Sequence, residues 1–270
     1  MLTEFEALEA NLRQSFRILA EGRPRAGLAE LDGVSIASLG AQFQMFNAAF
    51  LHRRVASRDD LERRLDIARG FFESNRMPWA FWVCEEWLAW PARRVLAGMC
   101  QDLGMQPVAE MPGMVADSLR ASGGFLQKSR PAAVLDIRRA EGPRMMDDFR
   151  AIGSACFHVP PVWFSEVFDD SIPSREFVCW VGYRGGKPVA TAATVTSDGV
   201  IGLYNIATVP EEQRRGYGEA ITRHAIAAAS SASGLRRVIL QSTSQGERLY
   251  KRLGFREVSR LVVFNSTVTK

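Results

Sequence analysis

The sequence predicts an α/β (α+β) fold in which a mixed, mostly antiparallel sheet is flanked by helices. Helical patterns, with apolar residues three and four apart, alternate with short apolar strand patterns along the 270 residues. In the second half, three apolar runs are separated by the glycine-containing turns RGGKP (184–188) and SDG (197–199), which favour antiparallel hairpins. The order of elements also recurs in the two halves, so we expect two similar domains in tandem.

The composition is that of a globular protein and argues against several classes of function. Hydrophobic residues make up 47% of the chain, charged residues make up 24%, and the net charge is only +4. The arginines form scattered pairs, which argues against nucleic-acid binding. No CxxC pair occurs among the four cysteines and there are only three histidines, so we expect reduced cysteines and no metal. An acidic, amphipathic N-terminus and the lack of an apolar run of about 20 residues predict a cytoplasmic protein without a membrane partner.

The first half contains two well-marked helix starts. Thr3 can cap one helix, with Glu6 completing a capping box, and Ser57 with Asp60 can open another. A further helix is expected at residues 85–104, kinked or restarted at its proline. The remaining predicted elements of this half are strands at 34–39, 43–51 and 78–84 and an extended segment at 105–119.

The segment RASGGFLQKSRP (120–131) is the best linker, because it is rich in small and polar residues. We therefore predict domains at residues 1–125 and 130–270. In the second domain we expect strands at 132–140, 176–209 (a meander), 235–243 and 255–266, and helices at 143–157, 161–170 and 245–254, with one more after residue 216.

Two short stretches of the halves match each other. CQDLGMQPVAE (100–110) aligns with YKRLGFREVSR (250–260) without a gap, and FNAAFL (46–51) aligns with YNIATV (204–209). Where the second half continues with PEEQRRGYGEA (210–220), the first has a segment without glycine. We therefore expect one ligand site per chain, in the second half.

The glycine-containing segment lies between a predicted strand and a predicted helix. Unpaired N–H groups at a helix start favour an anion, and glycines let phosphate oxygens approach the backbone closely. The segment is not a Rossmann fingerprint, because Ile221 stands where a small residue is required, and no Gly-Lys-Ser/Thr follows as in a P-loop. What remains is a Q-x-x-G-x-G phosphate loop with Gln213, Gly216 and Gly218.

Residues 204–255 resemble the GCN5-related N-acetyltransferase (GNAT) family. NIATVPEEQRRGYGEA (205–220) is similar to the signature strand, pyrophosphate loop and helix of the family, and RLYKRLGF (248–255) is similar to its closing helix. The resemblance extends over about residues 132–270. The first half would then be a degenerate GNAT-like domain, because Cys100 stands at the position that matches Tyr250.

The resemblance implies acetyl-coenzyme A as the acetyl donor and co-substrate. A signature strand would pair its backbone with the pantetheine arm, through Ile206, Ala207 and Thr208. The pyrophosphate would be held by the loop, through Gln213, Arg214, Arg215, Gly216, Tyr217, Gly218, Glu219 and Ala220.

The resemblance also implies that Tyr250 protonates the departing thiolate, which a phenol with a pKa near 10 can do within hydrogen-bond reach. Packing of this ring at helical spacing is the structural alternative. No base is evident, because residues 202–209 and 238–245 carry no carboxylate, and Gln241 and Ser242 stand where some relatives carry the acid. A water chain to solvent is one alternative, and His158 is another.

Three residues are candidates for binding the acceptor: His158 and Trp163, which lie in the predicted helix–loop–helix, and Asn205, on the signature strand. Each has a structural alternative: a loop histidine, a core aromatic and support for a strand bulge. The expected function is acetyl transfer to a primary amine of a small molecule. A protein N-terminal or lysine acetyltransferase and a non-catalytic acyl-coenzyme A sensor are the alternatives, and a monomer and a homodimer both stay open.

Overall fold

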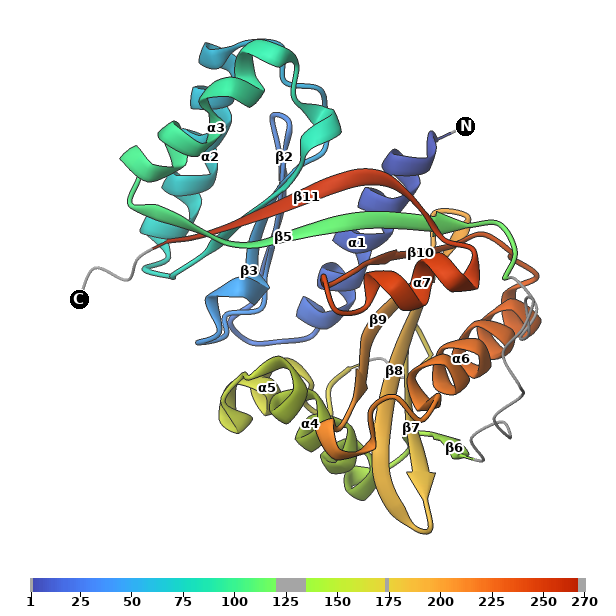
Figure 1. Cartoon of the computed structure of the whole chain (residues 1–270). Helices are drawn as coiled ribbons and strands as arrows, with labels where there is room; N and C mark the ends of the chain where they lie inside the picture. Colours follow the sequence, from blue (N-terminus) through green and yellow to red (C-terminus); the bar gives the residue numbers. More distant parts are fainter. Residues whose placement is uncertain (1, 120–134, 173–174, 267–270) are drawn as a thin grey trace. The chain divides into compact units, whose positions relative to one another are not determined.

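The computed structural model describes residues 2–119, 135–172 and 175–266 (Figure 1). The chain divides into two compact units, Met1–Gly113 with Glu257–Lys270 and Met114–Arg256. The predicted linker at 120–131 lies outside the described residues. The division differs from the predicted domains because the C-terminal strand belongs to the first unit, where it pairs with a strand from residues 80–84.

The first unit contains a sheet in the order β1-β2-β3-β4-β11, in which only β3 and β4 run parallel. Its elements are α1 Glu4–Ala20, β1 Gly27–Leu31, β2 Val34–Ser38, the short 3₁₀ helix Gln44–Phe46, β3 Asn47–Leu51, α2 Arg58–Ser74, β4 Ala80–Cys84, the 3₁₀ helix Glu85–Trp87, α3 Trp90–Asp102, most of β5 Met105–Ala116, and β11 Arg256–Ser266 from its second residue. Its core lies between the sheet and helices α2 and α3 and includes Phe72, Phe81 and Leu96.

Both predicted helix starts of the first unit are present. Thr3 and Glu6 form the capping box, and the Ser57 hydroxyl accepts the Asp60 N–H. The helix predicted at 85–104 begins only at Trp90, because Pro91 fits the first turn, where its missing N–H is not needed. Residues 44–46 form a 3₁₀ turn instead of strand, and the short, half-exposed strand β1 had no apolar signal in the sequence.

A charged side chain is buried in the first unit. Glu9 on α1 is 2% exposed, and its carboxylate oxygen lies 2.8 Å from Arg13 Nε. Burial raises the pKa of Glu9 to about 7, although Arg13 acts in the opposite direction. The folded protein thus holds this proton more tightly than the unfolded chain does, so ionisation of Glu9 removes stability as the pH rises from about 4.5 to about 7.

We therefore expect Glu9→Gln to raise the free energy of unfolding by about 1–2 kcal/mol at pH 8 and to change it little at pH 5. The gain is smaller than the full cost of the buried charge because Arg13 loses its partner. Urea denaturation at the two pH values measures it, with the exposed Glu62→Gln as control. Equal gains at both pH values would contradict the assignment of a buried, titrating carboxyl.

The second unit contains a sheet in the order β10-β9-β8-β7-β6, in which only β9 and β10 run parallel. Its elements are β6 Asp136–Arg139, α4 Pro143–Phe157, α5 Pro161–Val167, β7 Phe177–Arg184, β8 Lys187–Ser197, β9 Val200–Thr208, the 3₁₀ helix Pro210–Glu212, α6 Tyr217–Ser233, β10 Val238–Gln241 and α7 Glu247–Leu253. The meander and the helices agree with the sequence prediction. A mixed, mostly antiparallel sheet with flanking helices is therefore confirmed.

The two halves of the sequence repeat one order of elements (Figure 1). A hairpin leads into a parallel pair of strands joined by a helix, and a further helix and a long strand follow. In the first half this run is β2-β3-α2-β4-α3-β5, and in the second half it is β8-β9-α6-β10-α7-β11, of which β11 packs in the first unit from its second residue on. The recurrence allows each residue of the second unit's loop to be compared with its counterpart in the first.

Candidate active site

The edge of β9 that faces β10 is open over half of its length. The two strands pair only at Ile201, Gly202 and Leu203, and β10 ends at Gln241. From Tyr204 to Thr208, β9 therefore has no partner in β10, whereas on its other side it continues to pair with β8. This segment includes Ile206, Ala207 and Thr208, so its backbone groups could pair with an extended ligand.

Asn205 forms a bulge in this open segment. Tyr204 faces Ala193 of β8 and Ala207 faces Thr191, so three steps along β9 match two along β8. Asn205 has a φ of +50°, which asparagine tolerates better than most residues. The Thr191 hydroxyl donates a 2.9 Å hydrogen bond to the Asn205 carbonyl oxygen, so Asn205 supports the bulge.

The loop after β9 leads to an uncapped helix start. Gly216 immediately precedes α6 with a φ of +88°, which favours glycine, and no side chain caps the helix. The first N–H with a partner inside the helix is that of Ala220, which donates to the Gly216 carbonyl oxygen at 3.0 Å. The N–H groups of Tyr217, Gly218 and Glu219 thus have no helical acceptor, and the positive end of the helix dipole lies at the same place.

Ion pairs between side chains of the loop and its neighbours hold the loop in place. The Glu212 carboxylate accepts hydrogen bonds from Arg184 Nη1 on β7 at 2.9 and 3.1 Å, and it lies 3.2 Å from Arg215 Nε. Glu219 is paired with Arg223 at 2.8 Å. The charge of Arg215 is therefore shared with Glu212 rather than directed at a ligand alone, and Arg214 has a left-handed φ of +57°.

Hydrogen bonds and apolar packing also hold the loop before α6 in place. Gln213 Nε2 donates to the Thr208 carbonyl oxygen at 3.1 Å, and Gln213 Oε1 accepts from Gln245 at 3.3 Å. The Tyr217 side chain is buried in the core, so only its backbone can face a ligand. A Cβ at Gly218 would lie 3.4 Å from Thr208 Oγ1, which shows how closely the loop follows the open strand. The loop thus offers backbone N–H groups, and most of its side chains hold it in place.

Tyr250 lies on α7 in the core of the second unit. Its ring meets Phe255 edge-on, with the ring centroids 5.7 Å apart. Burial raises the pKa of Tyr250 above that of an exposed phenol, so the hydroxyl stays protonated at neutral pH. The ring therefore packs in the core, and a role of the protonated hydroxyl as a proton donor stays a prediction.

Gln241 and Ser242, which stand where some relatives carry a carboxylate, offer no general base. The Ser242 hydroxyl donates to the Thr243 carbonyl oxygen at 2.8 Å. Gln241 Nε2 is buried and has no hydrogen-bond partner within the described ranges. This buried amide donor lies at the end of β10, where β9 and β10 part, so it could donate to a group that is not part of the chain.

The structure gives less information about His158 and Trp163, the two residues on α4 and α5 that were predicted to bind the acceptor substrate. His158 is exposed and ends α4 with a φ of +54°, its N–H donating to the Ser154 carbonyl oxygen. Trp163 is half-buried on α5, next to Phe164, whose ring covers Gly153. His158 thus has a structural role as a helix terminator, and a role of either residue in binding stays a prediction.

Cys156 is a neighbour of the open strand that the sequence did not reveal. It lies on α4, and its sulfur faces the backbone N–H of Thr208 and the charge of Glu211. Burial is the main reason why the pKa of this thiol is raised, so it is not an activated nucleophile. Only the fold brings this helix position to the end of β9.

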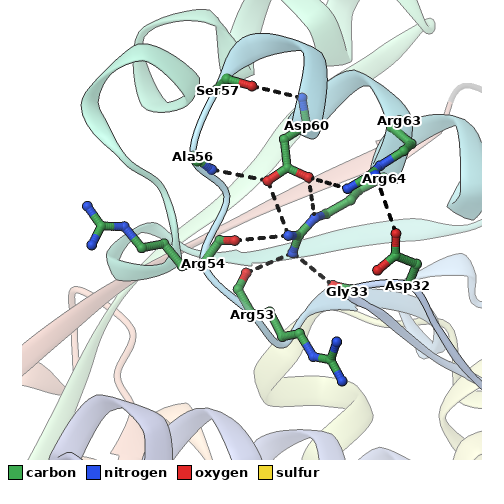
Figure 2. A network of polar contacts seen from close by, with 9 residues as sticks. All are labelled: Asp32, Gly33, Arg53, Arg54, Ala56, Ser57, Asp60, Arg63 and Arg64. Atoms are coloured by element: carbon green, nitrogen blue, oxygen red, sulfur yellow. Dashed lines mark hydrogen bonds and ion pairs between the residues drawn. The ribbon is translucent and has the colours of Figure 1, made fainter.

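The corresponding helix start in the first unit is filled by the chain itself (Figure 2). The Ser57 hydroxyl accepts the Asp60 N–H at 3.1 Å, and the Asp60 carboxylate accepts the Ala56 N–H at 3.1 Å. Burial opposes ionisation of Asp60, but this N–H and Arg64 outweigh it and lower the pKa of the carboxyl. The N-terminus of α2 therefore already has its anion, whereas no described side chain caps α6 and its first-turn Glu219 is paired with Arg223.

The loop before α2 also presents the opposite polarity. The buried Arg64 guanidinium donates to the carbonyl oxygens of Arg53 at 2.8 Å, Arg54 at 2.9 Å and Gly33 at 3.3 Å (Figure 2). This loop turns carbonyl oxygens toward a cation where the α6 loop offers N–H groups. Beyond it, the Val55 N–H donates to the Trp87 carbonyl oxygen at 2.8 Å, which joins the segments after β3 and β4. The first unit therefore lacks both the open strand and the open helix start.

Other kinds of site find little support in the structure. Across residues 2–119, 135–172 and 175–266, no group of three or more histidine, cysteine or acidic residues could hold a metal ion. The helices of the same ranges include none with the length and apolarity needed to span a membrane.

These features define an α/β protein with a phosphate-compatible helix start beside an open, bulged strand. Residues 175–257 match the family model described as "Acetyltransferase (GNAT) domain". This part of the chain is therefore similar to a GNAT acetyltransferase domain, and the matched range holds the open strand, the loop and Tyr250.

Solved structures resemble the chain over most of its length. A GCN5-related N-acetyltransferase from Kribbella flavida is 17% identical with a TM-score of 0.70, covering 96% of this chain and 95% of that one. A functionally unknown conserved protein from Staphylococcus epidermidis is 15% identical with a TM-score of 0.63, covering 89% and 94%. A GCN5-related N-acetyltransferase from Sphaerobacter thermophilus is 15% identical with a TM-score of 0.57, covering 87% and 76%. These likenesses establish the fold; no curated protein matches the sequence.

Proposed function

We propose that the protein transfers an acetyl group from acetyl-coenzyme A to a primary amine of a small molecule. One observation carries the proposal. Of the two equivalent strand–loop–helix segments, the one before α6 has an uncapped helix start beside an open strand, and it is on the unit with the buried, protonated Tyr250. The segment before α2 has none of these features.

The residues present fit coenzyme A. A pyrophosphate would be held by the N–H groups of Tyr217, Gly218 and Glu219, and Gly218 leaves the space in front of Thr208 clear of a side chain. The open edge from Asn205 to Ala207 could pair with the amide groups of the pantetheine arm, while the Thr208 carbonyl oxygen already accepts from Gln213. The orphaned Gln241 amide at the divergence of the strands is a further polar group for a ligand.

The chain's own residues then have distinct tasks. Bound acetyl-coenzyme A would supply an activated thioester. The open strand holds the arm in one orientation, and proximity supplies much of the acceleration. Tyr250 keeps a proton at its hydroxyl for the departing sulfur, which its raised pKa makes available throughout the neutral range. Because β9 and β10 carry no carboxylate, we infer that the amine loses its proton to water, with His158 as the alternative base.

A small acceptor is favoured by a cavity in the same unit. It has a volume of about 370 Å³, which is in the range of small-molecule sites. Phe177 lines it and stacks on Tyr204 of the open strand, with the ring centroids 6.3 Å apart. Its wall includes the carboxylates of Glu141, Asp169 and Asp170, which suit a cationic amine, beside the cationic Arg139, and Asp170 is also paired with Arg150.

The test is release of coenzyme A from acetyl-coenzyme A, with a panel of small amines, peptides with free N-termini and lysine peptides. Acetylation of small amines at the highest kcat/KM supports the proposal. Preference for peptides would instead favour a protein acetyltransferase. Tight binding of acetyl-coenzyme A without turnover on any acceptor would favour a sensor and overturn the proposed activity.

A further inference from the structure

Gly246 immediately precedes α7 in a conformation that does not require glycine. Its φ of −78° and ψ of −26° are right-handed helical, which any residue except proline adopts easily. The glycine that follows the same helix is different, because Gly254 has a φ of +103°. The absence of a side chain at Gly246 therefore has to be explained by space.

The space above Gly246 is filled by the ring of Tyr250, four residues later. A Cβ at Gly246 would lie 2.9 Å from Tyr250 Cε2 and 3.2 Å from Ser242 Oγ, and the first distance is shorter than real contacts allow. The backbone cannot easily withdraw. The Gly246 N–H donates to the Thr243 carbonyl oxygen at 3.0 Å, and the Gly246 carbonyl oxygen accepts the Tyr250 N–H at 3.2 Å.

The ring of Tyr250 has little freedom of its own. It is buried, and Phe255 meets it edge-on. The Tyr250 carbonyl oxygen also accepts the Phe255 N–H at 3.0 Å, which fixes the end of α7. An added methyl group at Gly246 would therefore displace the ring, and with it the hydroxyl at the ring's far end.

In the first unit, the corresponding pair of positions carries a large and a small side chain in the opposite order. The gapless match of 100–110 with 250–260 pairs Cys100 with Tyr250, and extending it four residues toward the N-terminus pairs Leu96 with Gly246. Leu96 and Cys100 are both buried in the core of the first unit. Where the large ring is replaced by a small thiol, a large side chain thus occupies the place of the glycine.

We propose that Gly246 is a positioning residue, whose missing side chain sets the place of the Tyr250 hydroxyl. The proposal rests on the proposed acetyl transfer for its effect on turnover, while the packing that it describes does not. Gly246 acts through Tyr250 and has no role of its own in binding coenzyme A.

The kinetic test is a cycle of Gly246→Ala with Tyr250→Phe. Gly246→Ala is expected to lower kcat about tenfold, since small misplacements of a reacting group are costly, and to leave the coenzyme A dissociation constant within about twofold. In the Tyr250→Phe background the same change is expected to have no further effect on kcat, because the hydroxyl is already absent. Equal losses in both backgrounds would show that Gly246 acts otherwise.

The packing test needs no activity. Gly246→Ala is expected to lower Tm by about 5 °C through overpacking, and to cause no loss when Tyr250→Leu has removed the ring. Gly98→Ala is the matched control, because a Cβ there meets nothing within 4 Å and alanine favours a helix. If Gly246→Ala keeps the wild-type Tm and kcat, the proposal is overturned. If the wild type turns over no amine, the proposed function fails, and the Tm cycle still decides whether Gly246 places the ring.

Discussion

Tyr250→Phe is expected to lower turnover about 100-fold while the affinity for coenzyme A changes less than twofold. The variant keeps the ring, so its contact with Phe255 and its packing over Gly246 are retained. Only the hydroxyl is lost, and general acid catalysis is typically worth a factor of about 10²–10⁴. Coenzyme A release measures turnover, and isothermal titration measures affinity.

A matched control for this variant is Tyr183→Phe on β7. Tyr183 is also a buried phenol of the second unit, and its hydroxyl donates to Asp148 at 2.8 Å. This variant is expected to lose some stability and to keep its turnover. Full turnover of Tyr250→Phe, or an equal loss in both variants, would contradict a role of the Tyr250 hydroxyl as the acid.

Arg64→Met is expected to lower the free energy of unfolding by about 3 kcal/mol or more. The side chain is buried, and three backbone carbonyl oxygens would lose their donor. Asp60 would also lose a buried partner and keep its charge, which is the costly way to break a buried pair. Methionine retains much of the volume, so the loss measures the polar network of Figure 2 rather than a cavity.

The neighbouring Arg63→Met separates this network from a general effect of arginine. Arg63 also contacts Asp60, at 2.8 Å, but its side chain is 58% exposed. Exposed pairs are worth about 1 kcal/mol or less, so urea denaturation should show a small change. If both variants unfold at the same urea concentration, Arg64 does not hold the loop before α2. Neither variant is expected to change coenzyme A affinity, because both residues lie in the first unit.

The fold of the second unit was predictable because its signals are local. The turns at 184–188 and 197–199 fixed the meander, and the glycines of the loop marked the start of α6. Pairing of β11 with β4 was not predictable, because Leu261 and Cys84 are far apart in the sequence and strand patterns do not name their partners. As a result, the C-terminal strand belongs to the first unit and the residues from Met114 on belong to the second, whereas the linker composition placed the boundary at residues 125–130.

The candidate site was predictable in its backbone and less so in its side chains. Gly216 was identified correctly as the start of the helix, because a left-handed φ at this position favours glycine and is therefore visible in the sequence. The pairing of Glu212 with Arg184 was missed because Arg184 lies on another strand, and the local pairing of Arg215 with the same carboxylate was missed with it. Arg64 was also missed, because its acceptors are backbone carbonyl groups, which every residue possesses and no motif marks.

The measurement that tests the account most directly is isothermal titration of the full chain with coenzyme A. One site per chain is expected, because of the two equivalent helix starts the one before α6 is uncapped, whereas the one before α2 is capped by Ser57. Binding should be weakened at least about tenfold in Gly218→Val, whose side chain would enter the space between the loop and Thr208, and unchanged in Asp60→Asn. Two sites per chain, or one site that Asp60→Asn weakens and Gly218→Val does not, would contradict it.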